Sequence, residues 1–305
     1  AKEGLEKVEL VSEHLLWSPG YEFMESDSQS RDMDIRKHII SNKFKYPLTD
    51  YLSISTDYNI TTRSFSDFND VLENEARIKL SYVNNPYGWA EGFYDIIAYN
   101  RDISAISTFG GKINIRIFDI GTFTFSYERE RLENTSNVII NHYYTDNFKE
   151  RLDIDVNSRL KVGADYLYES YSDHNDRYEP GFDVLYYFSL DPLRLSVKYR
   201  YFYKEFRNKV PAYWSPKGFT TNSAEFNWRH YLNKEEIFYG ADDVYYELGY
   251  NISLDSTNIA GHKFSGALNW DVNKRLNLNV KGSFTNSSCN VYRDSDIVAS
   301  LKYYF

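Results

Sequence analysis

Acidic and basic residues recur at every second position over much of this chain, and that spacing limits the chemistry they could do. Asp153 and Asp155 would share one face of an extended strand, where two carboxylates could act as a general acid and base. Nothing completes such a site. The six histidines are far apart in sequence, and there is no Gly-x-Ser-x-Gly turn, glycine-rich phosphate loop or cysteine cluster. We therefore predict no catalytic residue, no metal site and no cofactor.

The elements that carry these charges are predicted to be strands with one apolar and one polar face. Leu193, Leu195 and Val197 alternate with Arg194, Ser196 and Lys198, whereas an amphipathic helix would space its apolar residues three and four apart. About sixteen such segments occur, of roughly ten to fourteen residues, which is long enough to cross a bilayer at a tilt. They span 14–24, 31–44, 51–63, 74–85, 89–99, 104–118, 121–132, 147–159, 160–172, 178–190, 193–207, 219–232, 243–254, 261–272, 276–286 and 296–305.

Composition narrows the class of protein. Aromatic residues make up 18% of the chain, and the 29 tyrosines suit a membrane–water interface, because the ring is apolar and the hydroxyl polar. The mean hydropathy of −0.58 and the lack of any run of 18 apolar residues exclude membrane helices. A net charge of −9 argues against nucleic acid as a partner, and the single Cys289 excludes an intramolecular disulfide.

The connections and the final strand indicate a particular architecture. Short connections such as 157–159 and 190–192 alternate with longer polar ones such as 64–73, 133–146 and 208–218. The ending Ile297 to Phe305 alternates apolar and polar residues, stops on an aromatic, and is similar to the closing strand of bacterial outer-membrane β-barrels. We predict an all-β, antiparallel up-and-down transmembrane β-barrel of about sixteen strands over 14–305, with both termini periplasmic. A soluble sandwich or propeller is the alternative, but aromatic residues toward the strand ends favour contact with outer-membrane lipid.

If the apolar positions face lipid, the polar positions face the lumen. Acids concentrate on the predicted strands from 121 to 190 and bases on the strand 193–207, which would give a transverse field across the lumen. The simpler interpretation is that these charges pair across neighbouring strands. The residues that we predict to line a substrate path are Glu128, Asp153, Asp155, Asp165, Glu169, Asp183, Arg194, Lys198, Arg200, Glu225, Arg229 and Glu247.

The segment 208–219 differs from the other predicted loops. Pro211 and Pro216 bracket Tyr213 and Trp214 and restrict the backbone around them. Rigidly displayed aromatic rings could stack on sugar faces, or they could fold into the mouth of the pore or anchor at the membrane surface.

The sequence Tyr213-Trp-Ser-Pro-Lys217, followed by a strand ending at 228–232, resembles the late barrel segment of bacterial exopolysaccharide exporters of the cellulose, poly-N-acetylglucosamine and Pel types. The resemblance implies a sixteen-stranded carboxy-terminal barrel preceded by periplasmic tetratricopeptide repeats, a polysaccharide chain as partner, and an inner-membrane synthase complex. Residues 1–13 would then be a periplasmic linker or the remnant of a helical repeat.

Three functions follow from this reasoning. The first is a passive conduit that exports an exopolysaccharide, as in biofilm formation. The second is a general or solute-selective diffusion porin. The third is a barrel scaffold that holds a partner protein.

Overall fold

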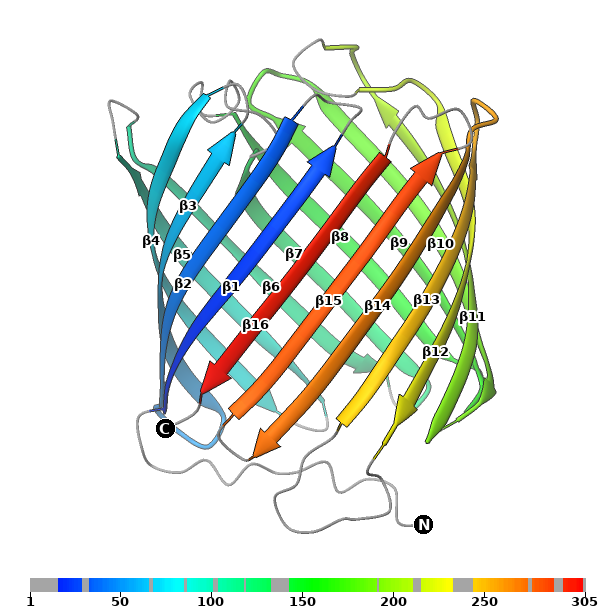
Figure 1. Cartoon of the computed structure of the whole chain (residues 1–305), viewed down its shortest axis with the longest axis horizontal. Coiled ribbons are helices and arrows are strands. Elements are labelled where there is room, and N and C mark those ends of the chain that lie inside the picture. Colours follow the sequence, from blue (N-terminus) through cyan, green and yellow to red (C-terminus); the bar gives the residue numbers. More distant parts are fainter. Residues whose placement is uncertain are drawn as a thin grey trace.

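The computed structural model describes residues 16–28, 33–65, 68–84, 87–100, 104–117, 119–132, 143–190, 192–210, 215–232, 244–273, 276–287 and 293–303. Over these residues, sixteen antiparallel strands form one closed barrel, in which each strand pairs with its sequence neighbours and β1 pairs with β16 (Figure 1). No helix among them is long and apolar enough to cross a membrane.

The strands are β1 (Leu16–Ser28), β2 (Met33–Pro47), β3 (Leu52–Phe65), β4 (Phe68–Asn84), β5 (Gly88–Tyr99), β6 (Ile106–Ile117), β7 (Gly121–Arg131), β8 (Tyr144–Asp155), β9 (Leu160–Tyr171), β10 (Asp176–Ser189), β11 (Leu193–Phe206), β12 (Phe219–Tyr231), β13 (Val244–Asp255), β14 (Ala260–Asn273), β15 (Leu276–Ser287) and β16 (Arg293–Tyr303). The predicted all-β, up-and-down barrel and its strand order are thus confirmed.

The β3–β4 connection departs from the sequence prediction. We expected a long polar loop over 64–73, but β3 and β4 continue as a ladder up to Phe65 opposite Phe68. The Asn and Asp residues of this segment favour turns, yet cross-strand pairing overrides that local preference. As a consequence Glu73, which we expected in a loop, lies in the wall of the barrel and is 1% exposed.

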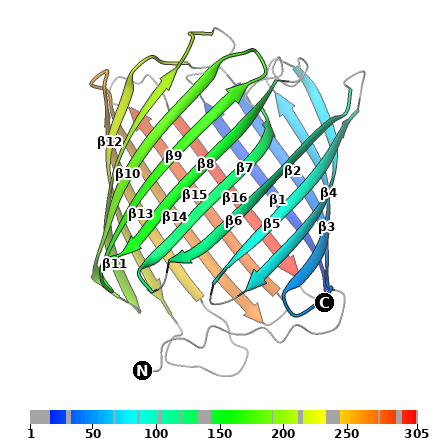
Figure 2. The same cartoon turned by 180° about the vertical axis from the view of Figure 1, so that it is seen from behind.

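The first strand begins and the last strand finishes at the same end of the barrel (Figure 1). β1 starts and β16 finishes at the lower end in Figure 1, and the view from behind in Figure 2 shows the same tilted, continuous wall. The short connections 48–51 and 156–159 lie at this end, whereas 207–210 and 215–218 lie at the other. Since outer-membrane barrels carry tight turns on the periplasmic side, the lower end is the periplasmic end.

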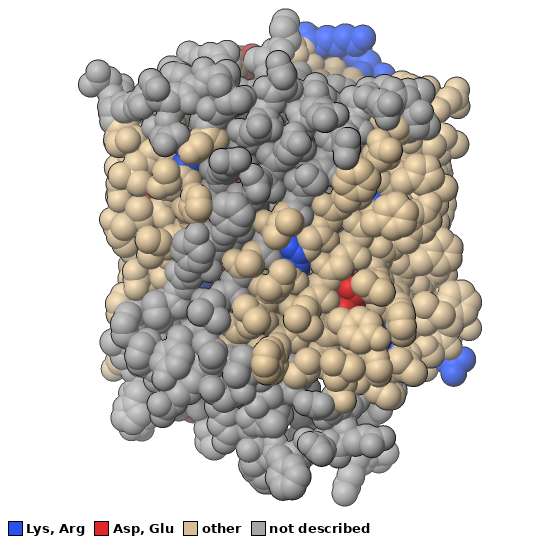
Figure 3. Space-filling model, in the orientation of Figure 1, with Lys and Arg blue, Asp and Glu red and all other residues tan. Residues whose placement is uncertain are grey.

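The outer wall is apolar. Large hydrophobic side chains at alternate positions point outward without protein cover: Leu248 is 50% exposed and Phe264 is 55% exposed. Uncharged residues dominate the described part of the flank in Figure 3, with only scattered acidic or basic atoms. The aromatic residues Tyr166, Tyr199, Trp228 and Trp270 are likewise exposed on this face. A soluble protein would not expose such a continuous apolar surface, so this wall faces lipid.

Candidate functional site in the barrel lumen

The strand register fixes which residues line the lumen. On β11, Leu195 and Tyr199 are exposed on the lipid face, so Arg194, Lys198 and Arg200 point inward. Ion pairs confirm this assignment, because Arg200 on β11 reaches past β10 to Asp165 on β9, with Nη2 and Oδ2 3.0 Å apart. By the same alternation the structure places all twelve predicted substrate-path residues on the inner face. Their part in transport stays a prediction.

A central cluster on β8 to β11 gathers several of these residues around Arg151. The Arg151 guanidinium donates to Asp153 (2.5 Å), to Asp183 (2.9 Å) and to Asp165 (3.2 Å). Arg200 also binds Asp165, and Lys198 lies 3.6 Å from Asp183. Sequence reasoning listed the acids but missed Arg151 as their hub. The acids and bases therefore neutralise each other across neighbouring strands, which removes most of the transverse field considered above.

Two glycines explain how this cluster lies flat on the wall. A Cβ at Gly163 would come within 2.5 Å of Arg151 Nη2 and 3.0 Å of Asp183 Oδ2, and one at Gly181 would come within 2.8 Å of Asp165 Oδ2. Real Cβ atoms do not approach other atoms so closely. The charged groups therefore occupy the space that side chains at these two lumen positions would fill, which keeps them close to the backbone.

A second cluster lies near the extracellular ends of β9 to β11. Arg177 binds Glu169 (2.9 Å) and Glu179 (2.8 Å), and Lys204 lies 3.3 Å from Glu179. Tyr171 donates to Glu169 at 2.6 Å, and its ring packs 5.6 Å from that of buried Phe206. Glu169 is thus held in a network and is 9% exposed.

The wall formed by β3 to β7 carries its own ion pairs. Arg77 makes two 2.7 Å hydrogen bonds to Asp95, which also accepts from Thr108 at 3.0 Å. At the extracellular end Glu73 binds Arg63 (2.6 Å) and Arg131 (2.5 Å). Arg131 reaches Glu73 from β7, past β5 and β6, so this contact braces the rim between strands that are not neighbours.

Aromatic rings in the lumen were not foreseen, because we assigned the aromatic residues to the lipid face. Each of several inward rings lies under a cation: Arg77 is 4.6 Å from the Phe93 centroid, Lys112 5.2 Å from Trp89, and Arg229 4.8 Å from Tyr245. Such contacts stabilise the cation and cover the ring face. Strict application of the two-residue alternation to Trp89 and Phe93 would have placed them inside.

A polar pocket of about 270 Å³ opens on the inner face of β10 to β13, toward their periplasmic ends. Arg229 binds Glu247 (2.6 Å) and Asn227 donates to Glu225 (3.1 Å). The pocket brings together five residues of the predicted substrate path. The side chains that line it are Leu185, Tyr187, Arg194, Ser196, Lys198, Glu225, Asn227, Arg229 and Glu247.

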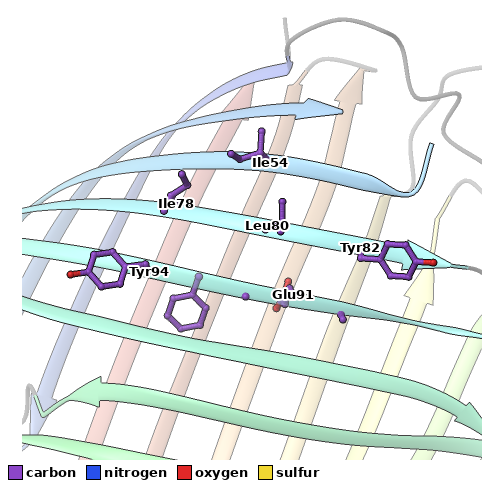
Figure 4. A pocket seen from close by; sticks show the side chains of 9 residues that line it. Ile54, Ile78, Leu80, Tyr82, Glu91 and Tyr94 are labelled. Atoms are coloured by element: carbon purple, nitrogen blue, oxygen red, sulfur yellow. The ribbon is translucent and has the colours of Figure 1, made fainter. Parts of the chain in front are cut away.

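A larger hollow of about 500 Å³ lies on the opposite side of the wall, over β3 to β5. Figure 4 shows Ile54, Ile78, Leu80, Tyr82 and Tyr94 around it. Ile78, Leu80, Tyr82 and Tyr94 are among the exposed side chains of the lipid face. This hollow therefore opens toward lipid and is not part of the lumen.

The loop with the aromatic motif is described only at its base. Tyr213 and Trp214 lie outside the described residues. Ser215 Oγ accepts from the Val210 amide at 2.7 Å, and Pro216 accepts from the Phe206 amide at 3.1 Å. The Ser-Pro part of the motif therefore closes the base of this loop. Within the described residues, no group of three His, Cys, Asp or Glu side chains is arranged to hold a metal ion.

Comparison with known proteins yields similar folds and no close relative. No protein-family model matches the chain, and no curated protein sequence does. A solved structure described as a bacterial polysaccharide outer membrane secretin aligns with a TM-score of 0.72 at 12% identity, over 95% of this chain and 98% of that one. OpdO from Pseudomonas aeruginosa aligns at TM-score 0.55 and 10% identity, over 96% of each chain. An anion-selective porin from Comamonas acidovorans aligns at TM-score 0.50 and 10% identity, over 96% and 99%.

These similarities concern the fold. Together with the apolar outer wall and the closed ring of sixteen strands, they lead to one conclusion: the chain is a porin-like β-barrel of the bacterial outer membrane.

Proposed function

We propose that this barrel is a passive conduit through which a polysaccharide leaves the cell. The observation that carries the proposal is that the charged side chains of the lumen are paired with opposite charges and lie close to the wall. In the central cluster, Arg151, Lys198 and Arg200 are matched by Asp153, Asp165 and Asp183, and the group lies flat over Gly163 and Gly181. A sliding polymer needs many weak polar contacts, because one strong site would trap it.

The similarity to the polysaccharide secretin supports this proposal, since that alignment has a higher TM-score than those with OpdO and with the anion-selective porin. Covered aromatic rings support it as well. With a cation over Trp89 and Phe93, a sugar meets hydrogen-bond donors at these positions instead of an open stacking face. A periplasmic helical-repeat domain before residue 14 and an inner-membrane synthase complex remain part of the proposal, since a passive barrel needs an external drive.

A solute-selective diffusion porin is the second candidate, favoured by the similarity to the anion-selective porin. The two candidates differ in how transport depends on substrate length. A linear glycan keeps its cross-section as it grows, so a conduit should admit longer chains at a slowly falling rate, whereas a solute-selective pore should show a sharp limit.

Liposome swelling with the purified full chain separates them. Linear maltooligosaccharides of two to about ten units are compared with a branched dextrin of equal mass, which presents a larger cross-section. We expect uptake of the linear series and exclusion of the branched sugar. Loss of uptake beyond two or three units would refute the conduit and favour the diffusion porin.

A further inference from the structure

The inner face of β13 to β15 differs in composition from the charged walls described above. These three strands lie side by side in Figure 1. Leu248, Phe264 and Val280 are exposed on their lipid face, so the alternate positions face the lumen. Most of the polar side chains described at these lumen positions are uncharged. The uncharged ones are Asn251, Ser253, Ser265, Asn269, Asn277, Asn279, Ser283, Thr285 and Ser287, and the charged ones are Glu247, Asp255, Lys263 and Lys281.

Three of these side chains offer hydrogen-bonding groups that the protein does not use. Asn251 stands opposite Lys263, Lys263 stands opposite Thr285, and Ser265 is the next inward residue on β14. Over the part of the chain that the structure describes, the side chains of Asn251, Ser265 and Thr285 make no hydrogen bond. An amide or a hydroxyl group both donates and accepts. This part of the wall can therefore bind hydroxyl groups in either sense.

The wall of β8 to β11 does not offer this freedom. There the Arg151 guanidinium is bonded to Asp153, Asp165 and Asp183, and Arg200 is bonded to Asp165 as well. Hydrogen bonds between charged groups are roughly twice as strong as those between neutral groups. A sugar hydroxyl would have to displace a stronger bond there, whereas at Ser265 it displaces only water.

The inner face of β13 to β15 is also flat and continuous. A Cβ at Gly249 would come within 2.4 Å of Ser265 Oγ, so the Ser265 side chain lies over Gly249 and close to the backbone. Toward the periplasmic end, Asn269 Oδ1 accepts from Asn277 at 3.2 Å and from Asn279 at 3.1 Å. Amide and hydroxyl groups thus follow one another along the height of the barrel.

We infer that the inner face of β13 to β15 is the track along which the polysaccharide slides, held by hydrogen bonds to its hydroxyl groups. The inference rests on the proposed function and names the wall and the chemical groups through which the cargo is bound. Asn251, Ser265 and Thr285 exchange hydrogen bonds with successive sugar hydroxyls, and the Lys263 ammonium between them donates. Because each contact is single and weak, the chain moves on. A neutral glycan carries every group that this track needs.

The test is thiol protection in planar bilayers with the full chain, in which Cys289 is replaced by Ser. A cysteine is introduced at Ser265 on the track, or at Ser126 on β7, across the barrel from β14 (Figure 2). Ser126 points inward, because its neighbour Tyr127 stands opposite Phe148, which is exposed on the lipid face. A charged methanethiosulfonate reagent modifies the cysteine and lowers the conductance. The rate is measured with and without saturating maltohexaose.

We expect maltohexaose to slow the reaction severalfold in Ser265→Cys and to leave the rate in Ser126→Cys unchanged. Each rate is compared with its own rate without sugar, so differences in exposure between the two sites cancel. Independently, Asn251→Ala and Thr285→Ala should each raise the half-blocking concentration of maltohexaose about threefold, as expected for the loss of one hydrogen bond, and Ser126→Ala should not. Heat-modifiable migration on gels establishes that each variant is folded.

The outcomes separate this inference from the conduit itself. Equal slowing in both cysteine variants would mean that the glycan fills the lumen without preferring a wall, and would overturn the track while the conduit stands. Slowing only in Ser126→Cys, or in neither variant although linear sugars are taken up in the swelling assay, would also overturn the track alone. No slowing together with no uptake of linear sugars would overturn both.

Discussion

Replacing Glu73 by Gln should destabilise the barrel far more than the same change at Glu91. Glu73 binds two guanidinium groups, Arg63 Nε at 2.6 Å and Arg131 Nη2 at 2.5 Å. The side chains are buried: Glu73 is 2% exposed, Arg63 4% and Arg131 10%. Glu91 binds Lys79 at 3.2 Å, but those side chains are 30% and 25% exposed. Both are lumen-facing glutamates on adjacent strands, so the pair compares a buried carboxylate bound by two arginines with a more exposed one bound by a single lysine.

The expected magnitudes follow from that difference. Removing one partner of a buried ion pair leaves uncompensated charge out of water and costs about 3–5 kcal/mol. We expect about 3 kcal/mol for Glu73→Gln, because the amide keeps part of the hydrogen bonding to Arg63 and Arg131. A water-exposed pair contributes about 0–1 kcal/mol, which sets the expectation for Glu91→Gln.

Urea unfolding of the refolded protein from lipid vesicles, followed by tryptophan fluorescence, measures both free energies. The slope of the unfolding free energy against urea must stay constant for the comparison to hold. If Glu73→Gln unfolds within about 1 kcal/mol of Glu91→Gln, the ion pairs do not brace the rim and the reasoning from burial is wrong.

Three further predictions concern the central cluster and the outer wall. Gly163→Ala should push the Arg151 guanidinium into the lumen, because the new Cβ would lie 2.5 Å from it, and should lower the single-channel conductance. Gly92→Ala should leave the conductance unchanged, because no atom lies nearer than 3.8 Å to its new Cβ. Equal conductance of the two variants would contradict the packing argument. Arg151→Gln leaves one negative charge unbalanced. Its interaction with a passing monovalent ion at one Debye length of about 10 Å is about 0.4 kcal/mol before screening. The reversal potential in a salt gradient should therefore move toward cation selectivity at about 0.1 M salt and return to the original value near about 1 M. A shift that survives high salt would point to a structural change instead. Leu248→Arg on the lipid face should cost about 2–4 kcal/mol in urea unfolding, whereas Asn251→Arg on the lumen face of the same strand should cost under about 1; similar losses would mean that the faces are assigned wrongly.

Alternation in the sequence was enough to predict the barrel, because each strand needs one face for lipid and one for water. β9, expected at 160–172, spans Leu160–Tyr171, and β11, expected at 193–207, spans Leu193–Phe206. The prediction was wrong where local residue preference and tertiary pairing disagree. Asn and Asp favoured a loop at 64–73, but the ladder of β3 and β4 extends through it.

The lumen residues were predictable as a set, and their partners were not. Inward alternation places Asp165 and Asp183 on the same wall, but only the register brings Arg151 to both. The role of Gly163 could not be predicted either, because a glycine in a strand has several explanations and the one that applies depends on the neighbouring side chains. Tyr213 and Trp214, which carry the family resemblance, lie outside the described residues, so their part in sugar contact remains a prediction.

The flat packing over Gly163 and Gly181 separates two properties that usually vary together. Where charged side chains stand out from the wall, any substitution changes both the bore and its charge. Here the number of strands and two glycines determine the bore, while Arg151 and its acidic partners determine the charge. The charge of this channel could therefore diverge during evolution, as one cargo replaced another, without any change in the width of the polymer that passes.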